Sequence, residues 1–209
     1  SQDLHDYVQE RYQPQSMLLV VVGKVRAEDV EREAEALFGA MVNDRIVTPP
    51  APYVFPAGNA EPEIKVEYGP WNKVRLQIAF PTDGMRGADE ANLEVLADLL
   101  AGDETSRLYR TFKYDKKLVD EISCSSLTLE RSGLFYIEAE LEAKNVAVFW
   151  RELLTELARL TGASFSDREL SRVRLNIEDG LYRAKETLGG LAMKAAFFRF
   201  YGYDPDGEA

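Results

Sequence analysis

The sequence predicts an α+β fold, a two-layer sandwich in which a largely antiparallel sheet carries helices packed on one face. Two observations predict this class. Segments of alternating apolar and polar residues occur as neighbouring pairs, which favours hairpins and hence antiparallel pairing. Longer segments carry apolar residues every three or four positions, which is typical of amphipathic helices that must bury one stripe against another layer.

The chain opens with an expected helix, strand and second helix. Residues 1–13 favour a short helix that stops near Pro14. Residues 17–23 (MLLVVVG) form a continuous apolar run closed by glycine, typical of a strand covered on both faces. Residues 26–39 favour a helix that begins with acidic residues and ends at glycine. Its apolar stripe comprises Val30, Ala34, Leu37 and Phe38.

Residues 42–60 predict an extended connection, because four prolines there remove backbone donors and fix φ. The piece before this connection is too small for a robust core of its own. We therefore expect a surface crossing inside one domain that covers residues 1–209 and has been excised from a longer chain.

The next segments predict a β-hairpin. Residues 63–69 alternate, with Ile64, Val66 and Tyr68 on one side, and residues 73–81 alternate more cleanly. Only a short turn separates them, although it lacks the Asn-Gly pair of the tightest hairpins.

The centre of the chain predicts two helices followed by two strands. Residues 88–102 favour a helix ended by glycine, and residues 106–117 favour a shorter helix with Ser106 as a candidate cap. Residues 118–129 and 132–142 follow as strands.

The last third of the chain predicts helices that pack on one face of the sheet. Apolar residues recur at three or four positions over 146–160. Ser166 and Glu169 form a capping box that opens the next helix. The pair Gly189-Gly190 is expected to break that helix, and a final helix continues to Tyr201.

Composition excludes several function classes. The 209 residues carry a formal net charge of −11, which disfavours nucleic acid as a partner because phosphate binding requires a basic surface. No apolar run approaches the roughly 20 residues of a membrane span. The single cysteine, Cys124, cannot form an intramolecular disulfide, and its apolar surroundings indicate a buried structural thiol.

The sequence lacks a complete catalytic or metal-binding motif. Its only histidine, His5, cannot supply either zinc motif that requires two histidines. Nucleotide-binding glycine loops and a serine nucleophile elbow are also absent from the sequence. Glu138, Glu140 and Glu142 alternate along one strand face, where a solvated sheet face is the preferred interpretation and a wet cavity is the alternative. We therefore predict no catalytic residue and no metal ligand in this chain.

Three blocks resemble the inactive-type domain of pitrilysin/insulinase metallopeptidases. The first, residues 5–39, contains a Tyr-x-Pro step, a strand closing in Val-Gly and an acidic helix closing in Phe-Gly. The second, residues 99–142, contains a Ser-Arg-Leu helix start and a strand pair. The third, residues 166–205, resembles the two closing helices. Together the three blocks cover nearly the whole chain. They occur in the same order and at the same spacing as in the family.

The resemblance implies that this chain is a substrate-chamber and structural domain of a zinc-dependent endopeptidase. In that family, the zinc site is an inverted His-x-x-Glu-His motif on a preceding domain, so zinc is expected in the parent protein and not in this chain. The implied partners are the zinc-bearing neighbouring domain, the C-terminal half of the same or a partner chain, and a peptide substrate.

The family also suggests candidate contact residues and a position in the parent. Arg107, Tyr109 and Arg110 lie in the short helix that resembles the family's Ser-Arg-Leu helix, and they are candidates for contacts with the chamber or another domain. The C-terminal half of such enzymes presents an arginine and a tyrosine that bind peptide. Lys113 and Asp120 occupy the corresponding positions here, which indicates the second domain of the N-terminal half.

Two other functions stay open at this point. The same fold occurs in inactive relatives, namely processing-peptidase partner subunits and respiratory-complex core subunits. A free-standing peptide-binding module is the third interpretation. Bacterial relatives occur in both cytoplasm and periplasm, and the sequence selects neither compartment.

Overall fold

A computed structural model describes residues 1–43, 62–85, 87–162 and 164–202. The chain divides into two compact units, one made of Ser1–Ala51 with Ile177–Ala209 and the other of Pro52–Asn176. Each is described by itself below. The expectation of one domain over residues 1–209 stays a prediction, and most of the proline-rich connection lies outside the described residues.

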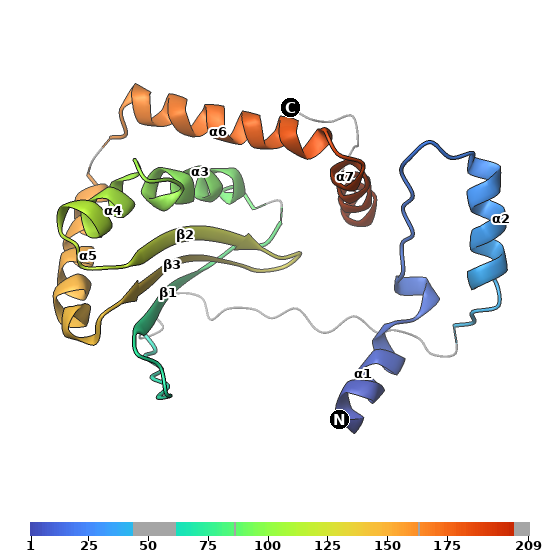
Figure 1. Cartoon of the computed structure of the whole chain (residues 1–209), viewed down its shortest axis with the longest axis horizontal. Helices are drawn as coiled ribbons and strands as arrows, with labels where there is room; N and C mark the ends of the chain where they lie inside the picture. Colours follow the sequence, from blue (N-terminus) through green and yellow to red (C-terminus); the bar gives the residue numbers. More distant parts are fainter. Residues whose placement is uncertain (44–61, 86, 163, 203–209) are drawn as a thin grey trace. The chain divides into compact units, whose positions relative to one another are not determined.

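The larger unit is built on a three-stranded antiparallel sheet (Figure 1). Strand β3 (Gly133–Leu141) lies between β1 (Val74–Thr82) and β2 (Glu121–Thr128). Ile137 of β3 pairs with Ile78 of β1 and with Cys124 of β2. Because side chains alternate across a strand, this register places the apolar residues of all three strands on one face.

Helices cover that apolar face. They are α3 (Glu90–Ala101), the short α4 (Arg107–Tyr109) with the π-helix that continues it (Arg110–Asp115), and α5 (Val146–Leu160), which follows a 3-10 turn (Ala143–Asn145). The core joins Leu100, Leu108, Phe112, Phe149 and Leu153 to the strands. The rings of Phe112 and Phe149 meet edge to face, with centroids 5.0 Å apart. The predicted two-layer α+β class is confirmed.

The smaller unit is helical. It contains α1 (Gln2–Arg11), a 3-10 turn (Pro14–Ser16), α2 (Ala27–Phe38) and α7 (Leu188–Tyr201). Helix α6 (Asp167–Lys185) begins in the larger unit and ends in this one. Its predicted capping box is confirmed, since the Ser166 amide donates to the Glu169 carboxylate at 2.9 Å and the Glu169 amide to Ser166 Oγ at 3.4 Å.

Two predicted strands are wrong. Residues 17–22 and 62–68 form neither strand nor helix, so the hairpin expected before β1 does not form. Most of their apolar side chains are exposed, reaching 84% at Ile64 and 92% at Tyr68. A strand needs a hydrogen-bonded neighbour as well as an alternating pattern, and neither segment is paired in the described structure.

Two local predictions also need correction. Ser106 precedes α4, but its hydroxyl donates to the carbonyl of Asp103 instead of capping the helix. The glycine pair does not separate the last two helices, because Gly189 and Gly190 lie in the first turn of α7. The break falls at Thr187, whose hydroxyl accepts from the Gly190 amide at 3.0 Å. A Cβ at Gly190 would collide with the carbonyl of Ala184, which explains the need for glycine there.

Candidate functional site

The three candidate contact residues lie on α4 and at the start of the π-helix that continues it, but they contact different partners. Arg107 contacts the start of α6. The hydroxyl of Tyr109 accepts from Lys113 at 2.8 Å. Arg110 is largely exposed and lies 3.8 Å from Asp115. The structure therefore does not gather them into one cluster, and their role in a chamber or domain contact stays a prediction.

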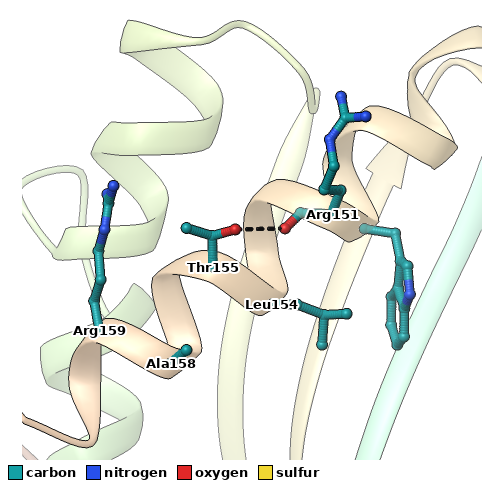
Figure 2. A pocket seen from close by; sticks show the side chains of 6 residues that line it. Arg151, Leu154, Thr155, Ala158 and Arg159 are labelled. Atoms are coloured by element: carbon teal, nitrogen blue, oxygen red, sulfur yellow. Dashed lines mark hydrogen bonds between the residues drawn. The ribbon is translucent and has the colours of Figure 1, made fainter.

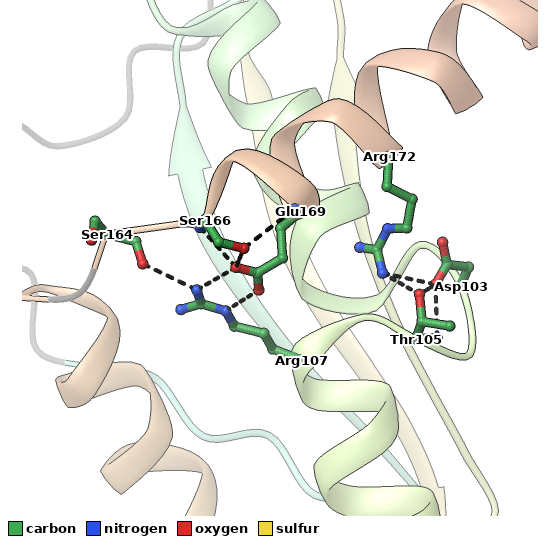
Figure 3. A network of polar contacts seen from close by, with 7 residues as sticks. All are labelled: Asp103, Thr105, Arg107, Ser164, Ser166, Glu169 and Arg172. Atoms are coloured by element: carbon green, nitrogen blue, oxygen red, sulfur yellow. Dashed lines mark hydrogen bonds and ion pairs between the residues drawn. The ribbon is translucent and has the colours of Figure 1, made fainter.

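Arg107 ties α4 to the first turn of α6 (Figure 3). Its Nε and Nη2 atoms donate to the two carboxylate oxygens of Glu169, at 2.6 and 2.9 Å. Nη2 also donates to the Ser164 carbonyl at 3.1 Å, and the guanidinium lies 4.2 Å from the centroid of the Phe165 ring. The arginine lowers the pKa of Glu169 to about 2, and the same hydrogen bond raises the pKa of Arg107.

A second contact joins the loop before α4 to the same face of α6 (Figure 3). Arg172 Nη1 lies 3.3 Å from the Asp103 carboxylate and also donates to Thr105 Oγ1. Although burial opposes ionisation, hydrogen bonds from Thr105 and the charge of Arg172 hold the pKa of Asp103 below its usual value. Burial, followed by the charge of Asp103, raises the pKa of Asp98. These contacts fix α6 on the larger unit.

Lys113 and Asp120, the residues expected at the positions of the family's arginine and tyrosine, both have partners in this chain. Lys113 Nζ donates to Glu121 at 2.5 Å and lies 4.8 Å from the centroid of the Tyr109 ring. The hydrogen bond to Glu121 raises the pKa of Lys113. Asp120 pairs with Lys73 at 3.0 Å, and this contact raises the pKa of Lys73. Both side chains are therefore held by pairings within this chain.

The sheet face opposite the helices carries several polar side chains. Arg75 and Glu140 pair across it at 3.4 Å, and the Gln77 amide donates to Glu138 at 2.9 Å. Ser123 and Ser125 of β2 stand opposite Glu138 and Tyr136 in the register. Glu138 and Glu140 thus belong to a partly solvated sheet face, the preferred interpretation of the sequence, whereas Glu142 lies beyond the end of β3.

No part of the described structure offers a metal site or a reactive thiol. No group of three or more His, Cys, Asp or Glu side chains could hold a metal ion within these residues. Burial raises the pKa of Cys124 to about 12, so the thiol is held in its unreactive neutral form. None of the helices in the described ranges is long and apolar enough to cross a membrane.

The sequence pattern predicted Glu169 as a capping residue but not its pairing with Arg107. It gave no indication of the contact between Asp103 and Arg172. The partners lie more than 60 positions apart, so no local pattern joins them. The contact between Tyr109 and Lys113 could have been found, because residues four apart face each other on a helix.

The sequence-family model of the peptidase M16 inactive domain matches residues 1–177 of this chain. An uncharacterized zinc protease of Rickettsia felis is 24% identical over 187 residues, which are 86% of this chain and 42% of that protein.

Solved structures share the fold. A protease from Helicobacter pylori superposes with a TM-score of 0.77 at 16% identity, over 96% of this chain and 49% of the other. A peptidase M16 inactive domain from Pseudomonas fluorescens gives a TM-score of 0.65 at 14% identity, over 87% and 43%. This chain spans less than half the length of each of these three proteins. The resemblance predicted from the sequence is confirmed, and the chain belongs to the peptidase M16 inactive-domain family.

Proposed function

We propose that this chain is a non-catalytic substrate-chamber domain of a zinc-dependent endopeptidase whose zinc site lies outside it. The family match over residues 1–177 carries this proposal. The neighbouring zinc-bearing domain, the C-terminal half of the same or a partner chain, and a peptide are its partners.

The residue content supports catalysis elsewhere. A catalytic zinc ion takes three protein ligands and keeps an open position for water or substrate. With one histidine in the whole sequence, this chain cannot supply the two histidines of the inverted zinc motif. In the parent, zinc would polarise the scissile carbonyl and activate water. This chain would form part of the chamber wall and pack against the neighbouring domains of the parent protein.

The one-sided burial of the sheet supports the chamber role. Helices cover the face that carries Ile137 and Leu141, both fully buried. The opposite face keeps amide, hydroxyl and carboxylate groups partly open to solvent. Such groups can hydrogen-bond an extended peptide without requiring one side-chain sequence. Lys113 and Asp120 stand where the C-terminal half of the family is expected to carry an arginine and a tyrosine, which favours the second domain of the N-terminal half.

Zinc stoichiometry tests the placement of the catalytic site. We expect one zinc per parent protein, and none bound by this chain after purification and dialysis. Zinc in neither protein would replace the proposal with an inactive scaffold related to processing-peptidase partners or respiratory core subunits. Tight equimolar zinc in this chain alone would overturn it.

Substitutions on the open sheet face test the chamber role in the parent. Tyr136→Ala with Glu138→Gln should change KM for peptide substrates while the zinc content stays constant. Glu130→Gln, in the turn between β2 and β3, serves as the control. Unchanged KM and kcat with several unrelated peptides would refute the contact between this face and substrate.

A further inference from the structure

The glutamates on the open face of the three strands differ in whether a cation neutralises them. Glu140 pairs with Arg75 at 3.4 Å, and Glu121 pairs with Lys113 at 2.5 Å. Glu138 lies two positions from Glu140 along β3 and therefore on the same face. It makes no ion pair with any residue in the described ranges. The excess negative charge of this face is thus concentrated at one carboxylate.

The side chains beside Glu138 position its carboxylate without cancelling its charge. The Gln77 amide donates to Oε1 at 2.9 Å, which leaves Oε2 without a hydrogen bond from another described residue. Ser123 of β2 stands opposite Glu138 in the register, and Tyr136 is the neighbouring residue on this face of β3. A carboxylate oxygen and an aromatic ring are the groups that bind the side chains of lysine and arginine.

Another open surface of the larger unit has the opposite charge. On the outer side of α5, a hollow of about 760 Å³ has Arg151 and Arg159 as its charged lining residues (Figure 2). Arg159 pairs with Glu156 at 2.8 Å, whereas Arg151 makes no ion pair with a described residue. Cationic side chains are disfavoured at this hollow. It therefore provides a control surface for binding that depends on charge.

We propose that Glu138 and Tyr136 select peptides that carry a lysine or arginine side chain. The inference rests on the proposed function, in which this sheet face contacts the peptide in the chamber. An extended peptide over β3 would place its cationic group against Oε2 of Glu138 and the ring of Tyr136. Glu140 and Glu121 would contribute less, because their charges are already paired within the chain. Complementary charge at one position supplies specificity without requiring a complete peptide sequence.

Binding of labelled peptides to the parent protein tests this selection. Fluorescence anisotropy, with zinc removed by a chelator to prevent cleavage, gives the Kd of short peptides that carry arginine or its neutral analogue citrulline at one position. That position is moved along the peptide in successive pairs. Where it reaches Glu138, arginine should bind about fivefold more tightly, the upper end for an exposed ion pair. The preference should vanish in about 1 M salt, where charges are screened beyond about 3 Å.

Substitutions assign the preference to named residues. Glu138→Gln should bring the two Kd values within about twofold of each other, and Tyr136→Leu should halve the preference because the carboxylate remains. Glu94→Gln on the exposed side of α3 and Arg151→Gln on α5 are controls that should leave it unchanged. Glu138→Lys should reverse it, so that a glutamate peptide binds more tightly than its glutamine counterpart. Only a folded chain can show this reversal, which separates charge selection from loss of structure.

Three results would overturn the inference, and they differ in what they imply for the chamber role. If Glu138→Gln weakens arginine and citrulline peptides equally, the sheet face contacts peptide without selecting its charge, and the proposed function stands. The same holds if the arginine preference survives both Glu138→Gln and Glu138→Lys. If no substitution on this face changes any Kd, the chamber role fails together with the selection.

Discussion

Removing the charge of Glu169 should destabilise the larger unit by about 2 kcal/mol. The variant Glu169→Gln keeps the size of the side chain and loses the charge that receives two hydrogen bonds from Arg107, at 2.6 and 2.9 Å. Hydrogen bonds to charged groups contribute about 1.5–3 kcal/mol, and exposed ion pairs about 0.2–1 kcal/mol. The pair is 29% and 26% exposed, which places it between these ranges.

The pKa of Glu169 gives a second measure of the same interaction. A fall from 4.5 to about 2 corresponds to roughly 3 kcal/mol at neutral pH in the absence of screening. Partial exposure reduces this to about 2 kcal/mol. Because the folded pKa is lowered, the stabilisation is complete above the unfolded value of 4.5 and is lost as pH falls toward 2.

Urea unfolding at pH 7, followed by circular dichroism, measures the difference in unfolding free energy between wild type and variant. The difference should shrink as pH falls below about 4.5, the unfolded pKa of the carboxyl. Asp179→Asn is the matched control, since Asp179 and Arg183 form an exposed pair on α6 at 2.7 Å and should contribute less than about 0.5 kcal/mol. Equal effects of the two variants, or an effect of Glu169→Gln that does not depend on pH, would refute the reasoning.

Three further predictions concern packing. Phe149→Ala should cost about 3–5 kcal/mol in urea unfolding because the ring is fully buried, whereas Leu175→Ala at a 64% exposed position should cost less than about 0.5 kcal/mol; similar costs would contradict the assigned core. Gly190→Ala should destabilise the chain by about 1–3 kcal/mol through its backbone collision, while Gly189→Ala, with open space around its Cβ, should be neutral or better; the reverse order in thermal unfolding would exclude the α7 start described. Cys124 should react with a thiol reagent at least about 100-fold more slowly in the native chain than in guanidinium, and equal rates would show that the thiol is accessible.

The local sequence determined much of the helical structure. The stripe over 146–160 predicted α5 with its buried side, and the pair Ser166 and Glu169 predicted where α6 begins. These features depend on residues within one or two helical turns of each other, so they can be read from the chain itself. The absence of zinc motifs could be predicted in the same way, because one histidine cannot supply two ligands.

Pairing between strands depended on contacts that a local pattern does not contain. Residues 63–69 alternate as regularly as β2, yet only β2 finds a partner in β3. Burial of a strand face requires both the pattern and a neighbour with free hydrogen-bonding groups. The alternation therefore predicted an apolar side for residues 63–69 but not its exposure.

The sequence by itself determined the fold class, the family resemblance and the lack of a zinc motif, because composition, periodicity and motif spacing are properties of the chain. Only the tertiary structure decided that Arg107 holds Glu169 and that Lys113 and Asp120 are occupied by Glu121 and Lys73. The physical reason is distance along the chain. An ion pair or hydrogen bond acts over a few ångströms in space, and folding alone brings most of these groups that close.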